Sequence, residues 1–140
     1  MKEIKVNAQL EELDNVLAFL EELIAPYDCS VKIDVNLHVA VEEMFVNIAH
    51  YAYPDNKDEG WAIIQGEVKE EADGPSLYIT FIDAGIYYDP LAKPDPDVTL
   101  SLEERQIGGL GIYMVKKSMD NMIYERKDDK NYLTIVKKLE

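Results

Sequence analysis

The chain has 140 residues, 47% hydrophobic and 30% charged, a composition that predicts one folded domain over residues 1–140 and excludes a disordered tail. Its formal net charge of −14 excludes direct nucleic-acid binding, because no surplus of Lys and Arg exists to displace counterions, and makes a basic protein partner easier to accommodate. No apolar run approaches the roughly 20 residues that span a bilayer, and the single Cys29 can form no internal disulfide, so we expect a cytoplasmic protein without a membrane partner.

Residues 1–6 alternate between polar and apolar side chains and predict a short strand. Helical spacing of apolar residues then predicts a helix over about residues 9–25, with Asn7 as its N-cap and Pro26 beyond its end. The apolar side of this helix consists of Leu10, Leu13, Leu17, Leu20 and Ile24. We expect this side to pack into the core, and a homodimer or partner surface is the alternative.

A second helix is predicted over about residues 34–52, followed by a polar loop at residues 54–60. Its apolar side consists of Leu37, Val41, Met44, Phe45 and Ile48. Residues 61–68 and 77–82 are typical of two antiparallel strands joined by a turn at residues 71–75.

Three prolines between residues 89 and 107 exclude regular structure and predict a long loop, which in a compact domain is usually functional or mobile. A helix over about residues 110–118 and two strands, at about residues 122–126 and 132–138, complete the chain. Early helices, antiparallel hairpins and one helix before the last strand pair predict an α+β fold. We expect a two-layer sandwich whose mostly antiparallel, mixed sheet is covered on one face by helices.

The second predicted helix carries Glu43, Asn47 and His50, whose side chains fall within about 60° of one another around the helix axis. The simplest interpretation is a solvated polar face. The functional interpretation assigns three chemistries: a carboxylate that accepts a proton, an amide oxygen that binds Mg²⁺, and an imidazole that donates a hydrogen bond to phosphate.

Asp83 ends an apolar strand, and Gly85, two positions later, allows the chain to turn. Aspartate at a strand end is most often a turn former. A buried carboxylate at such a place is also a specific acceptor for an exocyclic amine, such as that of adenine, and rejects ligands that lack this donor.

Three glycines, Gly108, Gly109 and Gly111, open directly onto the helix predicted at residues 110–118. Glycine lets backbone N–H groups approach a ligand closely, and a following helix N-terminus favours an anion. The cluster lacks the Lys-Ser/Thr ending of a Walker loop, so a simple tight turn is an equal alternative. In so acidic a chain a polyphosphate also needs a divalent cation, because only isolated cations such as Arg105 lie nearby.

Together these motifs resemble the GHKL ATPase superfamily. They occur in the order Glu43-x-x-x-Asn47-x-x-His50, Asp83-x-Gly85-x-x-Tyr88-Asp89-Pro90 and Gly108-Gly109-Leu110-Gly111. The compact length, the Glu-Arg-Gln-Ile-Gly-Gly-Leu-Gly passage and the two closing strands resemble the anti-sigma-factor serine kinases of bacterial partner-switching systems. One departure is Tyr87, where many superfamily members have a second glycine.

The resemblance implies a Bergerat-type fold that binds ATP with Mg²⁺. By position, Asn47 corresponds to the Mg²⁺ ligand, Glu43 to the catalytic base, and Asp83 to the residue that binds the adenine amine. Gly85 corresponds to the turn beneath the base, and residues 89–107 to a lid over the nucleotide. The phosphates would be wrapped by Gly108, Gly109, Leu110 and Gly111, with His50 and Arg105 as polar neighbours.

For function, the resemblance implies a regulatory protein serine/threonine kinase that phosphorylates a STAS-type anti-sigma-factor antagonist and sequesters a sigma factor. Three alternatives stay open. They are a switch of the same fold that binds nucleotide without transferring phosphate, the ATP-binding half of a histidine kinase, and an interaction module with an empty site.

Overall fold

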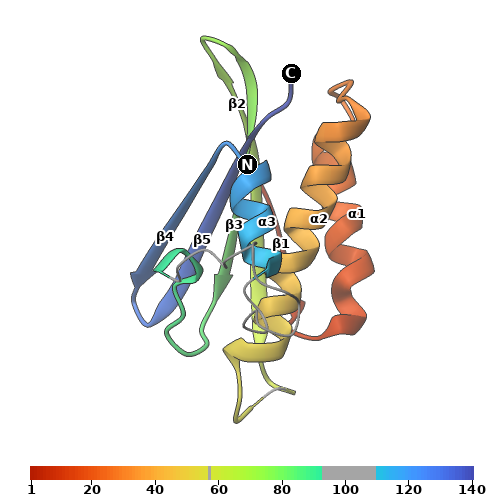
Figure 1. Ribbon diagram of the computed structural model, residues 1–140. Coiled ribbons are helices and arrows are strands. Elements are labelled where there is room, and N and C mark those ends of the chain that lie inside the picture. The colour runs from red at the N-terminus through yellow and green to blue at the C-terminus, as the bar shows by residue number, and fades with distance from the viewer. Residues whose placement is uncertain (57, 93–109) are drawn as a thin grey trace.

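The structure is a computed structural model that describes residues 1–56, 58–92 and 110–140. Within these ranges five strands form one sheet in the order β1-β2-β3-β5-β4, every pair is antiparallel, and the helices cover one face (Figure 1). The strands are β1 (Lys2–Asn7), β2 (Trp61–Glu71), β3 (Gly74–Asp83), β4 (Asn121–Lys127) and β5 (Lys130–Lys138). The helices are α1 (Leu13–Ile24), α2 (Val31–Asn47) and α3 (Leu110–Ser118), with short turns η1 (Leu10–Glu12), η2 (Ile48–Ala52) and η3 (Pro90–Ala92).

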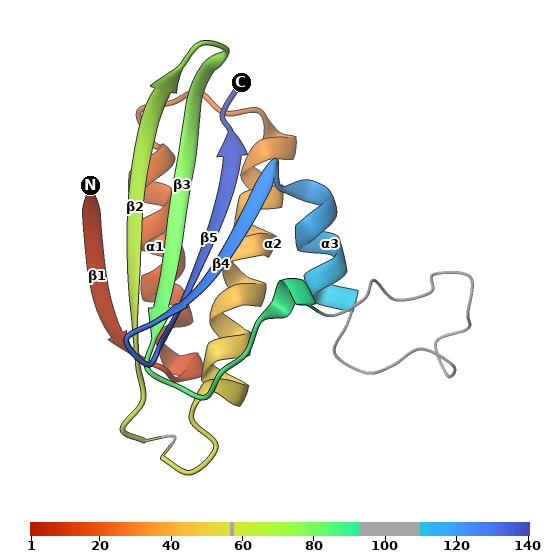
Figure 2. The same ribbon diagram turned by 90° about the vertical axis from the view of Figure 1, so that its left-hand side faces the viewer.

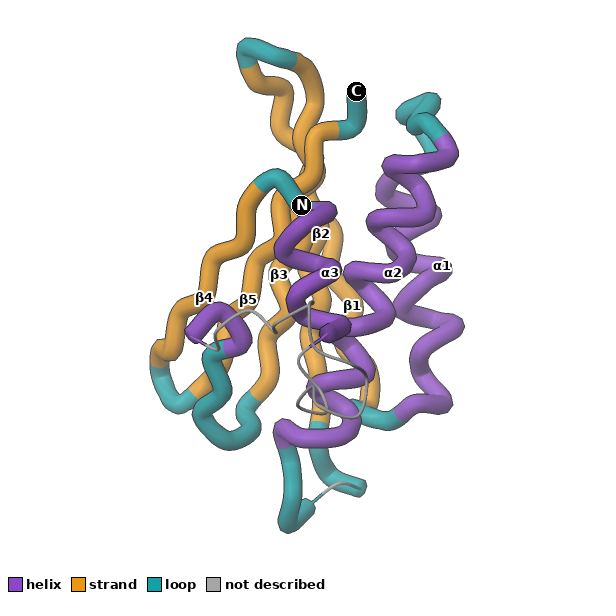
Figure 3. The backbone as a smooth tube through the Cα atoms, in the orientation of Figure 1, coloured by secondary structure: helices purple, strands orange, loops and turns teal. Residues whose placement is uncertain are grey.

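The predicted two-layer α+β sandwich is confirmed, and Figure 3 separates its strand layer from its helix layer. The alternating pattern of residues 1–6 becomes β1, at the edge of the sheet beside β2. The segment at residues 93–109, which holds most of the predicted lid, lies outside the described residues. None of the described helices is both long and apolar enough to cross a bilayer.

The first helix begins later than predicted. The turn η1 precedes α1, and Asn7 is the last residue of β1 instead of an N-cap. Leu10 is 47% exposed, whereas the buried side of α1 consists of Val16, Phe19, Leu20, Leu23 and Ile24. The segment carries two overlapping apolar stripes, and packing on the sheet selects the one that includes Phe19. Gly66 of β2 permits this contact, since a Cβ there would lie 2.2 Å from Leu23 Cδ1.

The second helix starts and ends for identifiable reasons. Ser30 is its N-cap, and its Oγ accepts a hydrogen bond of 3.2 Å from the Ile33 N–H. All five residues of the predicted apolar side are buried. At Ile48 the N–H is shared by the carbonyls of Met44 and Phe45, and the helix widens into the π-helical turn η2. Such π turns often occur at functional sites.

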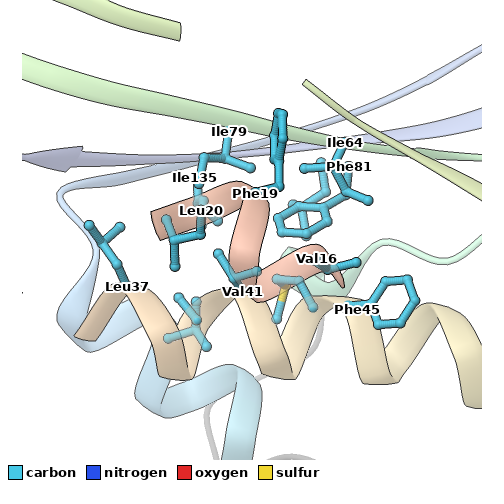
Figure 4. Packing of buried hydrophobic residues seen from close by; sticks show 14 of the residues in the cluster. Val16, Phe19, Leu20, Leu37, Val41, Phe45, Ile64, Ile79, Phe81 and Ile135 are labelled. Atoms are coloured by element: carbon cyan, nitrogen blue, oxygen red, sulfur yellow. The ribbon is translucent and has the colours of Figure 1, made fainter. Parts of the chain in front are cut away.

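The hydrophobic core fills the space between the helices and the covered face of the sheet (Figure 4). Each fully buried large side chain there contributes roughly 1.5–3 kcal/mol from the apolar area removed from water. The residues labelled in Figure 4 are Val16, Phe19, Leu20, Leu37, Val41, Phe45, Ile64, Ile79, Phe81 and Ile135. This packing fixes α2 across the sheet, so that its C-terminal end lies beside the end of β3.

The last two strands form a hairpin whose turn was predicted at residues 128–131. Asp128 and Asp129 both have positive φ, 53° and 60°, as the tight turns that match strand twist require. The turn brings Asn131, at the start of β5, opposite Asp83 at the end of β3.

Candidate functional site

A narrow pocket of about 40 Å³ is lined by residues from the end of α2, from η2, from the end of β3 and from β4 and β5. Figure 2 shows how these segments of the backbone are arranged. Its apolar walls include Met44, Phe81 and Leu133, and aromatic side chains from Tyr51, Tyr88 and Tyr124 surround it. Two polar residues predicted from sequence, Asn47 and Asp83, line it together. Apolar walls with a few convergent polar groups are typical of a small-molecule site.

Asp83 is 5% exposed and presents its two carboxylate oxygens differently. Its Oδ1 accepts hydrogen bonds of 2.9 Å from the Gly85 N–H and 2.9 Å from Asn131 Nδ2. Its Oδ2 accepts none from the described residues, although Asp83 lines the pocket. Burial raises the pKa of the Asp83 carboxyl group above its ordinary value, and the donors around it only partly oppose this. The pocket therefore contains one unpaired carboxylate oxygen as a hydrogen-bond acceptor.

Gly85 lies directly against the backbone of η2. A Cβ at this position would lie 2.2 Å from the Ala52 carbonyl oxygen, so no larger residue fits without backbone movement. The Ile86 N–H donates a hydrogen bond of 2.9 Å to the same carbonyl oxygen. Tyr53 supports the turn from the other side, because its hydroxyl accepts a hydrogen bond of 2.8 Å from the Ala84 N–H. The turn after Asp83 is thus attached to the end of the α2 segment.

Asn131 connects this turn to the hairpin of β4 and β5, and sequence reasoning missed it. The residue is 6% exposed, and its Nδ2 donates to Asp83 Oδ1 and, at 2.8 Å, to the Ile86 carbonyl oxygen. Its Oδ1 accepts from the Tyr124 hydroxyl at 2.6 Å and from the Tyr88 N–H at 3.4 Å. In the sequence Asn131 reads only as a turn residue, and no local pattern distinguishes it.

Arg126 adds a positive charge to the same network. Its Nη1 donates to Asn131 Oδ1 at 3.1 Å and to the Gly85 carbonyl oxygen at 2.9 Å. We call Asn131, Arg126 and Tyr124 the turn clamp, because Asn131 and Arg126 bond to the turn at Asp83, Gly85 and Ile86, and Tyr124 bonds to Asn131. Buried networks in which each group is paired hold one geometry strongly.

Asn47 and Glu43 lie about one helical turn apart on α2. The Asn47 side chain is half-buried, lines the pocket, and forms no hydrogen bond with a described residue. Glu43 is not among the pocket-lining residues. Its carboxylate lies against the first turn of α3, where a Cβ on Gly111 would be 2.2 Å from Glu43 Oε2. The structure therefore brings together Asn47 with Asp83, and Glu43 with Gly111.

The other site residues predicted from the sequence either do not line the pocket or lie outside the residues that the structure describes. His50 is exposed in η2 and stacks edge-on against Tyr51, with ring centroids 5.8 Å apart, and it does not line the pocket. Arg105, Gly108 and Gly109 lie outside the described residues, and Leu110 is described only as the first residue of α3. The role predicted for each of these residues stays a prediction.

The fold and the pocket define a class of protein, and comparison with known families gives the same class. The chain belongs to the histidine kinase-like ATPase domain family, whose model matches residues 6–137. It is accordingly an ATP-binding domain of the superfamily that its motifs resemble, and that prediction is confirmed.

Two known proteins are similar to this chain, one in sequence and one in structure. The serine/threonine-protein kinase BtrW of Bordetella bronchiseptica is 26% identical over 121 residues, which cover 86% of this chain and 82% of that protein. The crystal structure of the RsbU and RsbW domains of Rv1364c from Mycobacterium tuberculosis matches with a TM-score of 0.60 at 13% identity. The match covers 99% of this chain but 33% of the Rv1364c chain, so that likeness shows the shared fold.

Proposed function

We propose that the chain is an Mg-ATP-dependent protein serine/threonine kinase that phosphorylates an anti-sigma-factor antagonist and sequesters a sigma factor. The observation that carries this proposal is a line of groups from Asp83 to Glu43. It consists of the second carboxylate oxygen of Asp83 and the Asn47 amide, neither of which is hydrogen-bonded to a described side chain, and a second carboxylate one helical turn further along α2. Membership of the family and the kinase named among the relatives support it.

The adenine would bind in the pocket with its amine donating to Asp83 Oδ2. The pocket fits this group, because its walls are apolar and aromatic and the free oxygen is an acceptor where adenine carries a donor. Guanine has a carbonyl oxygen at the corresponding position, which would face Asp83 Oδ2 without a hydrogen bond. The same geometry therefore predicts selection of adenine over guanine.

Mg²⁺ would be held by the Asn47 amide oxygen together with phosphate oxygens and water. The fit is chemical: Mg²⁺ prefers hard oxygen ligands and keeps several waters, and Asn47 Oδ1 is not committed to a described partner. When bound, the ion would supply the positive charge that this acidic chain lacks near the phosphates. The segment from Gly108 to Gly111 would supply backbone N–H donors there, with His50 and Arg105 as further polar contacts and residues 89–107 as the lid.

Glu43 would act as the general base. In the proposed step the serine or threonine hydroxyl oxygen of the partner forms a bond to the γ-phosphorus. The bond from that phosphorus to the β–γ bridging oxygen breaks, ADP leaves, and the hydroxyl proton passes to the Glu43 carboxylate. Glu43 is half-buried and lies next to Gly111, so its carboxylate is near the place expected for the γ-phosphate.

The test is transfer of label from [γ-³²P]ATP to a candidate antagonist protein, with Mg²⁺ present. We expect label on a serine or threonine of the partner, and its loss in Asn47→Ala together with loss of Mg-ATP binding. Glu43→Gln is the matched variant, because it should retain nucleotide binding and lose transfer by about 10²–10⁴-fold. Tight nucleotide binding by the unmodified chain without label would support the non-catalytic switch and overturn the kinase.

A further inference from the structure

A second hollow, about 390 Å³ in volume, lies between α2 and α3. The two helices run side by side in opposite directions in Figures 1 and 2. We call this hollow the lysine groove, and the residues that line it include Lys32, Asn36, Tyr113, Met114, Lys117 and Lys137. Asn36 and Asn47 both lie on α2, about 16 Å apart along the helix axis at 1.5 Å per residue. The groove is thus separate from the nucleotide pocket.

The charge of the groove is opposite to that of the whole chain. The sequence has 28 acidic and 14 basic residues, yet three lysines and no acidic residue occur among the described residues that line the groove. Lys137 is partly neutralised, because its Nζ donates to the Ser118 carbonyl oxygen at 2.8 Å and lies 3.8 Å from an Asp120 carboxylate oxygen. Lys32 and Lys117 form no ion pair with a described residue. Lys117 Nζ lies 5.5 Å from the centroid of the Tyr113 ring, a contact that leaves its charge in place, so these two lysines give the groove positive charge that no described carboxylate neutralises.

Exposed apolar side chains accompany this patch. Met114 of α3 is 53% exposed. On α2, Val35 and Val39 are 52% and 37% exposed and follow Lys32 and Asn36 by three residues, which places them next to those residues on the helix surface. A free inorganic anion needs no apolar contact. A nucleic acid or an anionic membrane extends far beyond the groove and would face the acidic surface of a chain with net charge −14, whereas a short helix would lie mainly within about one Debye length, roughly 8 Å, of the groove lysines. The combination fits a protein segment that carries both carboxylates and apolar side chains.

We propose that the lysine groove binds an acidic amphipathic helix of a protein partner. The carboxylates of that helix would pair with Lys32 and Lys117, and its apolar side would lie on Met114 and Val39. A groove between two helices is a common receptor for a third, amphipathic one. The proposal does not depend on phosphoryl transfer and goes beyond the kinase function, because it assigns a partner of stated chemistry to a surface distant from the nucleotide pocket.

The probe is a displayed library of random peptides of about 16 residues, long enough for about four helical turns, selected on the full chain. We expect the enriched sequences to combine Asp and Glu with apolar residues spaced three or four positions apart. Affinity of an enriched peptide is then measured by fluorescence anisotropy. The double variant Lys32→Glu/Lys117→Glu should weaken it by at least about tenfold, because two attractive charges become repulsive. Met114→Ser should weaken it about threefold or more through lost apolar contact.

The matched control is Lys2→Glu/Lys127→Glu, which reverses two exposed lysines outside the groove and gives the same net charge. Equal weakening by both double variants would mean that only overall charge matters and would overturn the proposal. Enriched peptides without acidic residues, or duplex DNA or phosphatidylserine vesicles that compete through Lys32 and Lys117, would overturn it as well. Stabilisation by ATP should be unchanged in every lysine variant, so failure of the groove is distinguishable from failure of the nucleotide site.

Discussion

Asp83→Asn replaces the buried pocket carboxylate with an amide of nearly the same shape. An Asn Oδ1 can still accept from the Gly85 N–H and from Asn131 Nδ2, the two contacts of 2.9 Å that Asp83 Oδ1 makes. The unpaired oxygen Oδ2 becomes an NH₂ group, which donates hydrogen bonds and does not accept them. The substitution therefore reverses the polarity of the pocket while it preserves the shape and the internal hydrogen bonds.

The expected loss in affinity follows from this reversal. A hydrogen bond to a charged acceptor is lost, and the adenine amine faces another donor in a buried pocket, at a combined cost of about 2–3 kcal/mol, or roughly 30- to 150-fold. Adenosine and ATP should lose affinity by the same factor, because both carry the amine and only ATP carries phosphates. Isothermal titration calorimetry with both ligands measures the two factors separately.

The same variant should be at least as stable as the unmodified chain without ligand. Because burial raises the pKa of Asp83, its contribution to stability is fully present below the ordinary aspartate pKa of about 4 and is lost as the pH rises through the raised value. Asn has no such dependence. The stability of Asp83→Asn relative to the unmodified chain should therefore increase from acid to neutral pH in urea unfolding.

Two outcomes would refute this reasoning. Unchanged adenosine affinity in Asp83→Asn would mean that Oδ2 does not recognise the base. A variant that is less stable at neutral pH would mean that burial of the carboxylate is not what raises the pKa of Asp83. Asp129→Asn is the control, because it makes the same chemical change in an exposed turn and should alter neither measurement.

Three further substitutions test the surroundings of the pocket. Asn131→Ala leaves several buried partners unpaired and should cost about 2–4 kcal/mol in urea unfolding, and a loss below about 1 kcal/mol would contradict the turn clamp. Gly85→Ala sets a Cβ against the Ala52 carbonyl oxygen and should lower the free energy of unfolding by about 1–3 kcal/mol. It should also lower ATP affinity measured by calorimetry. An unchanged free energy of unfolding and an unchanged ATP affinity would exclude the close contact. Gly111→Ala should slightly stabilise α3, because alanine favours a helix more than glycine does, but its Cβ should displace the flexible Glu43 carboxylate. Phosphoryl transfer should then be about 10- to 100-fold slower at similar ATP affinity. Unaltered transfer would argue against Glu43 as the base.

Much of the fold was predictable because local patterns agree with the tertiary structure. The apolar side of α2 is buried as predicted, since five residues at helical spacing leave one choice of face. The alternation in residues 61–68 and 77–82 likewise determines which side chains of β2 and β3 enter the core. In α1 the apolar residues allow two stripes, and packing on the sheet, which includes the contact between Leu23 and Gly66, selects one of them.

The candidate site was predictable where a residue type carries chemistry in a motif. Asn47 and Asp83 were singled out from their motifs, and the structure brings both to one pocket. Contacts between residues far apart in the sequence are not marked by any such motif. Asn131 is 48 positions from Asp83, and in the sequence it belongs to a polar turn. The lysine groove likewise combines lysines from α2, α3 and β5, which have no common pattern along the chain.

The turn clamp also explains how Asp83 can serve as an acceptor despite its burial. Only the ionised carboxylate keeps both oxygens as acceptors, and burial works against ionisation by raising the pKa. The Asn131 amide, the Gly85 N–H and the Arg126 charge all lower the pKa, and the two hydrogen bonds go to Oδ1 alone. They thereby favour the charged form without occupying Oδ2. An apolar residue of similar size at position 131 would fill the space, but Arg126 Nη1 would lose one acceptor and Asp83 would lose one donor. The Asn131 amide therefore matters to recognition of the base by Asp83, although it need not touch the nucleotide.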